Sequence, residues 1–179
     1  DAGGNITVEG IKPELHQSVV EVGSTVCQTP AEIREEVVRL RGEVHDLAAT
    51  DGLRIMAAGT HPFSSWMDQA ITPLERYLGV EQDLQDLARK NLIFGMHVHV
   101  GIEDREFLID AMRVSRYFLP HILALSTSSP FWMGRTTGLK SYRSVQWRNF
   151  PRTGIPPTFS TYAEYEHILQ SLVNANAID

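Results

Sequence analysis

The sequence has a single cysteine and no long hydrophobic run. One thiol cannot form an internal disulfide, which agrees with a reducing compartment. Cys27 has no basic partner nearby and lies in an apolar stretch, so we expect a buried structural thiol rather than a nucleophile. The longest apolar candidate, residues 118–126, is interrupted by Pro120 and His121 and is about half of the ~18 residues that a membrane-spanning helix requires. We therefore expect a cytoplasmic protein with no membrane partner.

Positive charge is also in short supply. Sixteen Lys and Arg residues stand against 22 Asp and Glu, for a net charge of −6, and the basic residues are scattered along the chain. This distribution argues against a nucleic-acid partner. Neither the phosphate-binding pattern Gly-x-x-x-x-Gly-Lys-Ser/Thr nor the dinucleotide-binding pattern Gly-x-Gly-x-x-Gly is present. With 42% hydrophobic and 21% charged residues, the composition is that of a globular α+β or α/β domain.

Helix starts are the clearest local signals. Thr29 and Glu32 have the spacing of a capping box, with Pro30 at the first helical position. Apolar residues three and four apart follow until the turn signal at residues 51–52. Further capping signals occur at Asp104 and at the pair Thr161 and Glu164. The sequence therefore predicts helices over about 30–50, 74–90, 105–125 (with a bend or restart at Pro120) and 162–172.

Runs of β-branched residues predict strands. They cover residues 15–26 and 92–102, with a short buried strand over residues 53–58 between them. Residues 128–160 are rich in proline, glycine and arginine. A structureless loop of that length is uncommon in a compact domain, so this stretch is either functional or built of short strands.

His97 and His99 are the first candidate functional group. On a strand, residues two apart point to the same face, so both imidazoles would project together. Gly95 and Gly101 leave room for something to approach the backbone. Imidazole binds metals readily, so a shared ion is one interpretation, and two exposed or hydrogen-bonded histidines are the other.

Glu14 and Glu21 are the second group, in or beside a stretch otherwise suited to burial. Glu21 stands between Val20 and Val22, and an unpaired carboxylate is costly to bury. On a central strand it would need a cation or a metal, whereas on an edge strand it would be solvated. Mg²⁺ prefers carboxylate oxygens, so a glutamate pair suits it better than two histidines.

The third group is the glycine- and hydroxyl-containing loop 134–143, which ends in Arg143 and is followed by Arg148 and Arg152. The planar arginine fork grips carboxylate or phosphate in two places. Glycines and hydroxyls commonly accompany it in anion sites. The alternative is a solvated loop whose arginines pair with nearby carboxylates.

Several segments form a longer pattern when read in order along the chain. They are Lys12–Ser18 with Val20–Val22, then Met96–Gly101, Leu119–Ser126, Ser129–Gly134, Thr137–Arg143 and Pro151–Pro157. Together they resemble the bacterial carboxylate–amine ligase family, the second group of glutamate–cysteine ligases. The resemblance covers nearly the whole chain.

The resemblance implies a fold and a reaction. Members of the family have a glutamine-synthetase-like α+β fold, in which an antiparallel sheet curves into a funnel backed by helices. They use ATP and Mg²⁺ to convert the γ-carboxylate of glutamate into an acyl phosphate, which an amine, typically that of cysteine, then attacks. The implied partners are therefore these small molecules, and the implied process is glutathione biosynthesis.

The resemblance also implies roles for residues. Glu14 and Glu21 fall where related ligases place carboxylates on Mg²⁺, and His97 falls near the metal and the nucleotide. Arg143 falls where an arginine contacts a substrate carboxylate or phosphate, which makes it the expected catalytic residue. The expected nucleotide-binding residues are His97, His99, Arg148 and Arg152.

The chain departs from the family pattern at both ends. The opening motif Gly-(Val/Ile)-Glu-x-Glu and the later Trp-Trp-Asp-x-Arg segment are missing. We therefore expect residues 1–179 to be one partial catalytic domain without the N-terminal strand and the C-terminal half. Such a domain should be inactive alone, and exposed sheet edges would allow it to form homo-oligomers.

Two other functions stay open on the sequence. A metal-dependent hydrolase also uses a His-x-His pair on a strand, but that pair should open the chain and be followed by regular β/α alternation. A non-catalytic domain that binds nucleotide or amino acid is the third possibility. Tight Zn²⁺ binding without nucleotide would favour the hydrolase, and ATP binding without turnover would favour the binding domain.

Overall fold

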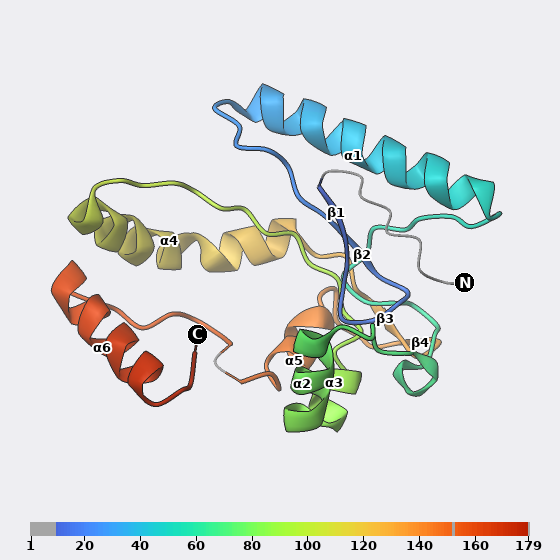
Figure 1. The fold of residues 1–179 in the computed structure, drawn as a ribbon. Helices are drawn as coiled ribbons and strands as arrows, with labels where there is room; N and C mark the ends of the chain where they lie inside the picture. Colours follow the sequence, from blue (N-terminus) through green and yellow to red (C-terminus); the bar gives the residue numbers. More distant parts are fainter. Residues whose placement is uncertain (1–9, 152, 179) are drawn as a thin grey trace.

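A computed structural model describes residues 10–151 and 153–178 (Figure 1). Helices accompany two small antiparallel sheets of two strands each, so the predicted α+β class is confirmed. Figure 1 shows α1 along one edge of the molecule, α4 and α6 near each other at another, and α2, α3 and α5 together in the lower middle of the view. The elements are β1 (Ile11–Pro13), β2 (Val20–Val22), α1 (Pro30–Thr50), the 3₁₀ helix η1 (Trp66–Asp68), α2 (Glu75–Leu84), α3 (Asp86–Arg89), α4 (Arg105–Leu125), β3 (Phe131–Trp132), β4 (Arg135–Thr136), α5 (Arg143–Trp147) and α6 (Tyr162–Asn174).

The capping box predicted for α1 is confirmed. Thr29 Oγ1 accepts the backbone N–H of Glu32 at 3.2 Å and donates to Glu32 Oε1 at 3.0 Å. The same carboxylate accepts the N–H of Gln28 at 2.8 Å, and this hydrogen bond, the largest cause, lowers the pKa of Glu32. The helix ends at Thr50, and Gly52 supports the turn that follows with a φ of +70°.

Side chains also cap α4 and α6 as predicted. Asp104 Oδ1 accepts the N–H of Phe107 at 2.9 Å, and Thr161 Oγ1 accepts the N–H of Glu164 at 3.2 Å. Pro120 lies inside α4, which continues as one helix to Leu125, so the restart considered at this proline does not occur. The expected helices over 105–125 and 162–172 are therefore present with small changes of boundary.

The single helix predicted over 74–90 is divided into α2 and α3. Gln85, between them, has a φ of +48°, a backbone conformation that ends an α-helix. Glu81 Oε1 lies 2.9 Å from Arg89 Nε and links the two helices across this break. Ala88 within α3 and Leu92 just after it are fully buried, so tertiary packing helps to hold the two pieces together.

The predicted strand over 15–26 is much shorter than expected. Only Val20–Val22 forms β2, which pairs antiparallel with β1 and sets Lys12 opposite Glu21. Cys27 lies outside the strand and is only partly buried, and its Sγ donates to the carbonyl of Thr25 at 3.4 Å. The expectation of a buried thiol on a strand was therefore wrong. β-branched composition favours extended backbone but supplies no pairing partner.

The strands predicted over 53–58 and 92–102 do not form. One antiparallel bridge joins Thr60 to Ile93, and the N–H of Phe94 donates to the carbonyl of Gly59 at 3.0 Å. Beyond this bridge, both segments are irregular in the part of the chain described. Met96 and Val98 are 84% and 70% exposed instead of lying on a buried face. A strand needs hydrogen-bonded neighbours as well as alternating side chains, and these segments have no such neighbours here.

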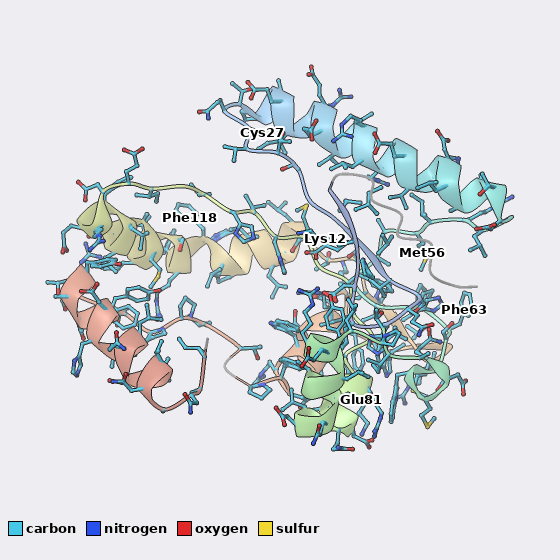
Figure 2. The ribbon with its side chains drawn as sticks, in the orientation of Figure 1. Lys12, Cys27, Met56, Phe63, Glu81 and Phe118 are labelled. Atoms are coloured by element: carbon cyan, nitrogen blue, oxygen red, sulfur yellow. The ribbon has the colours of Figure 1, made fainter. Side chains whose placement is uncertain are left out.

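The long helices bury little of their apolar faces. Leu40 is 1% exposed in α1, whereas Ile33, Val37 and Leu47 are 38–44% exposed. Figure 2 shows side chains gathered most densely around α2, α3 and α5, while Cys27 and Phe118 lie on outlying parts. None of the helices in residues 10–151 and 153–178 has the length and apolar character needed to cross a membrane.

Candidate anion-binding site

Three segments meet at Ser129, which is 2% exposed. Its N–H donates to the carbonyl of Lys140 at 3.1 Å, and its own carbonyl accepts the N–H of Tyr142 at 2.9 Å. Its hydroxyl oxygen accepts the N–H of Arg143 at 3.1 Å. Next to it, the N–H of Gly59 donates to the carbonyl of Ser128 at 3.1 Å. These bonds fix the start of α5 against the Thr60–Ile93 bridge.

Gly59 packs closely against Ser129. A Cβ on this residue would lie 2.9 Å from the Cβ of Ser129, and that atom cannot move without its backbone. The neighbouring Thr60 is 2% exposed, and its hydroxyl donates to the carbonyl of Phe131 at 2.8 Å. The loop that follows α4 is therefore anchored firmly to the bridge.

Arg143 is the best-positioned of the predicted site residues. Its Nε donates to the carbonyl of Phe94 at 2.6 Å, across 49 residues of sequence. No carboxylate among residues 10–151 and 153–178 forms an ion pair with it. Burial lowers the pKa of its guanidinium because the half-buried charge is desolvated without an anionic partner. A bound carboxylate or phosphate would supply that missing anion.

An aromatic pair flanks Arg143. The guanidinium carbon lies 5.5 Å from the ring centroid of Trp147, four residues later on α5. Trp147 in turn stacks on Phe150, with ring centroids 5.5 Å apart and an interplanar angle of 2°. These rings restrict the guanidinium on one side, so its orientation is set by both a hydrogen bond and a ring face.

His97 approaches the same place. A Cβ built on Gly95 would lie 2.8 Å from Nη2 of Arg143 and 3.8 Å from Nε2 of His97. The imidazole rings of His97 and His99 have centroids 6.1 Å apart and are both exposed. The structure therefore brings His97 close to Arg143, with His99 next to His97. We call Phe94, Gly95, His97, Ser129 and Arg143 the Arg143 site.

Glu14 is hydrogen-bonded both to its neighbour in sequence and to a distant segment. Its carboxylate accepts the N–H of Leu15, and its carbonyl accepts the hydroxyl of Thr72 at 2.5 Å. Burial, followed by the nearby charge of Glu14, raises the pKa of Tyr77. Glu14 is thus half-buried among groups that stabilise its position.

Glu21 lies on the exposed strand β2, opposite Lys12. It therefore lies on a solvated strand and not a central one. In the described part of the chain, no group of three or more His, Cys, Asp or Glu side chains is close enough to hold a metal ion. Glu14, Glu21 and His97 do not by themselves make a complete metal site, and their role in metal binding stays a prediction.

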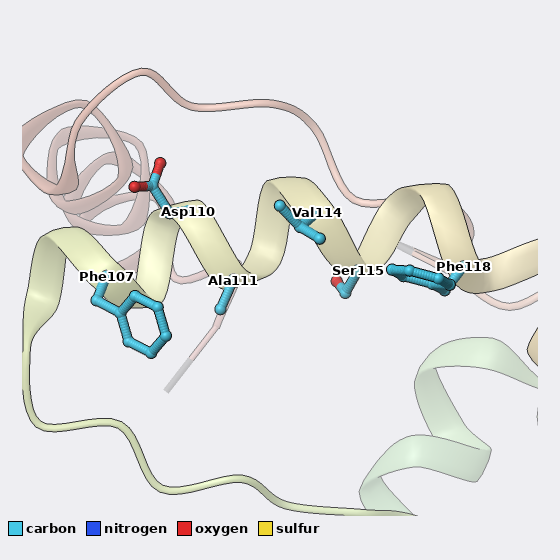
Figure 3. A pocket seen from close by; sticks show the side chains of 6 residues that line it. All are labelled: Phe107, Asp110, Ala111, Val114, Ser115 and Phe118. Carbon is cyan, nitrogen blue, oxygen red and sulfur yellow. The ribbon is translucent and has the colours of Figure 1, made fainter.

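The remaining predicted nucleotide ligands are less well placed. Arg148 is exposed immediately after α5, and Arg152 lies outside the described residues. A shallow hollow of about 410 Å³ lies elsewhere, on one face of α4 (Figure 3). None of the predicted site residues lines this hollow. Its lining residues all belong to α4 and are Phe107, Asp110, Ala111, Val114, Ser115 and Phe118.

Sequence reasoning missed the groups that hold Arg143. The carbonyl of Phe94 carries no sequence signal, and Ser129 was named only as the first residue of the family segment Ser129–Gly134, with no role of its own. Trp147 could have been found, because it follows Arg143 by four residues, a spacing that places two side chains on the same face of a helix.

The fold and the Arg143 site define an α+β protein with a candidate centre for carboxylate or phosphate. The sequence profile of the Glutamate-cysteine ligase family 2 (GCS2) matches residues 3–179. The chain therefore belongs to glutamate–cysteine ligase family 2, and the family predicted from its motifs is confirmed.

Bacterial relatives agree with this assignment. The chain is 60% identical over 179 residues to a protein of Herpetosiphon aurantiacus, covering all of the chain and 46% of the relative. It is 62% identical over the same length to one of Roseiflexus castenholzii, of which it covers 47%. A Sorangium cellulosum relative is 55% identical over 168 residues, or 94% of the chain and 45% of the relative. All three are named "Putative glutamate--cysteine ligase 2", and the chain spans a little under half of each.

Proposed function

We propose that this chain is a partial catalytic domain of an ATP-dependent carboxylate–amine ligase that joins glutamate to an amine such as cysteine. The observation that carries the proposal is the guanidinium of Arg143. It is anchored through Nε to the carbonyl of Phe94, half-buried, without an ion-pair partner in the described residues, and close to His97. The family membership and the relatives' names support the same reaction.

The proposed reaction has two steps. An oxygen of the glutamate γ-carboxylate attacks the terminal phosphorus of ATP, and ADP leaves with the electron pair of the broken P–O bond. The nitrogen of the amine then attacks the acyl carbon, inorganic phosphate leaves, and the amine loses a proton. Both steps require anions to be held in a fixed orientation, because phosphoryl transfer depends mainly on positioning and charge stabilisation.

Arg143 suits this requirement. A guanidinium fixed through Nε keeps its Nη groups for a carboxylate or phosphate, in a geometry that bidentate binding needs. We assign His97 to the same anion, and His99, Arg148 and Arg152 to nucleotide binding. Bound Mg²⁺ would supply charge neutralisation on the phosphates. Glu14, Glu21 and His97 are its proposed ligands, and they need partners beyond the groups assembled among the described residues.

The proposal extends to the fold. Residues 53–58 and 95–102 diverge from a bridge that already sets them antiparallel. We infer that they become strands of a glutamine-synthetase-like funnel when neighbouring strands are present, as they would be in a protein of the relatives' length. A cytoplasmic location and homo-oligomer formation through such edges belong to the same proposal.

A chimaera tests this function. The 179 residues replace the matching part of the Roseiflexus castenholzii relative, which is 62% identical, and phosphate release from ATP is measured with L-glutamate and L-cysteine. We expect release that requires both substrates and falls about tenfold or more in kcat/KM with Arg143→Lys, because lysine lacks the planar fork. Arg41→Lys, at an exposed position of α1, is the matched control and should retain activity.

Two results would contradict the proposal. One is the absence of phosphate release by a folded chimaera when the unmodified relative is active. The other is Zn²⁺-dependent hydrolysis without nucleotide, which would indicate the metal-dependent hydrolase instead. The isolated 179 residues should release no phosphate, because no complete metal site is assembled within residues 10–151 and 153–178.

A further inference from the structure

Two side chains approach the place that a side chain on Gly95 would take. Arg143 Nη2 and His97 Nε2 are 2.8 Å and 3.8 Å from the position that a Cβ on this glycine would take. Gly95 has no positive φ, so its backbone conformation is open to any residue. What the position requires is space. A side chain there would touch both the guanidinium of Arg143 and the imidazole of His97.

We propose that Gly95 is a positioning residue, whose missing side chain lets Arg143 and His97 bind one anion, a carboxylate or a phosphate, together. This inference rests on the proposed function for the identity of the anion, but not for the geometry. The Nε bond to the carbonyl of Phe94 places the guanidinium directly beside the next residue, Gly95. Trp147 limits its movement on the ring side.

The type of contact sets the consequence of substitution. At Gly95, the atom in the way is the far end of a flexible side chain, so Gly95→Ala displaces the guanidinium and leaves the fold intact. At Gly59, the atom in the way is the Cβ of Ser129, so Gly59→Ala would disturb the backbone. Gly95→Ala should therefore change the position of the Arg143 side chain, whereas Gly59→Ala should lower the stability of the fold.

Gly101 provides a matched control. It lies in the same irregular segment, has no positive φ, and a Cβ on this residue would have no atom within 4 Å. Gly101→Ala adds the same methyl group to the same kind of backbone, without touching Arg143. Differences between the two variants therefore report on the space at Gly95.

The first experiment is nuclear magnetic resonance of the Nε–H of Arg143 in the 179-residue chain. Its hydrogen bond to Phe94 should give a signal protected from exchange with water, assigned by its loss in Arg143→Lys. We expect this signal to shift or disappear in Gly95→Ala and to persist in Gly101→Ala, with equal unfolding midpoints for both variants. An unchanged signal in Gly95→Ala would overturn the inference whatever the chain's activity.

The second experiment separates the sources of the anion. The wild-type chain is titrated calorimetrically with L-glutamate in one arm and with inorganic pyrophosphate in the other. We expect at least one to bind, with Kd raised about tenfold by Gly95→Ala and unchanged by Gly101→Ala. Binding unaffected by Gly95→Ala, or no binding of either probe, would overturn the anion-positioning role. Failure of the chimaera to release phosphate, with these shifts present, would instead count against the proposed reaction.

Discussion

The hydroxyl oxygen of Ser129 accepts the backbone N–H of Arg143 at 3.1 Å. Ser129 is almost fully buried, so this N–H has no water to replace a lost acceptor. The bond fixes the backbone from which the Arg143 side chain reaches the carbonyl of Phe94. The position of the site therefore depends on a residue that has no chemical role of its own.

Removing this hydroxyl should destabilise the fold. Ser129→Ala leaves a buried donor unsatisfied, which costs about 1–3 kcal/mol of unfolding free energy. Ser128→Ala, at an exposed neighbouring serine, should change it by less than about 0.5 kcal/mol. Urea denaturation of both variants measures the difference. Equal losses in the two would mean that the Ser129–Arg143 bond contributes nothing specific.

The packing of α1 depends on one side chain. Leu40 is 1% exposed, while Leu47 on the same helix is 38% exposed. Leu40→Ala should therefore cost about 2–5 kcal/mol, and Leu47→Ala should cost less than half of that loss. Chemical denaturation followed by circular dichroism compares them. A comparable loss in both variants would indicate that the whole apolar face of α1 is buried in solution.

His16 should make stability depend on pH. Its Nε2 donates to the carbonyl of Arg89 at 3.0 Å, and burial lowers its pKa below the usual 6.5. Between these two pKa values the unfolded chain binds the proton that the folded chain does not. The unfolding free energy therefore falls as pH drops below 6.5 towards the lowered pKa.

Substitution isolates this contribution. His16→Gln can keep a donor near the carbonyl of Arg89 but cannot titrate, so the fall in stability below pH 6.5 should become shallower. Part of the fall in stability should remain in His16→Gln, because burial also lowers the pKa of His61. His45→Gln, at an exposed position of α1, should leave the profile unchanged. If the unfolding free energy of His16→Gln depended on pH as strongly as that of the wild type, His16 would not be a source of the pH dependence.

Local signals predicted the helices well, because the information lies within a few residues. The boxes at Thr29 and Thr161 and the cap at Asp104 each depend on atoms no more than three residues apart. The strands over 53–58 and 92–102 were predicted wrongly, because a strand depends on neighbours that its own sequence does not specify.

The site, like the fold, was predicted only where the information is local in sequence. Its chemistry was visible, since Arg143 and His97 were both singled out from the sequence. Their proximity was not, because it depends on contacts between distant segments. The carbonyl of Phe94 and the hydroxyl of Ser129 position Arg143 across 49 and 14 residues of sequence, respectively.

The most direct test of the account is isothermal titration of the Roseiflexus castenholzii chimaera with ATP, with and without Mg²⁺. The account predicts binding that strengthens with Mg²⁺, weakens about tenfold or more in Arg143→Ala and Glu21→Ala, and is retained in Arg41→Ala. Binding that is unchanged by both Arg143→Ala and Glu21→Ala, or no binding by a chimaera shown to be folded, would contradict the claim that these residues hold the nucleotide.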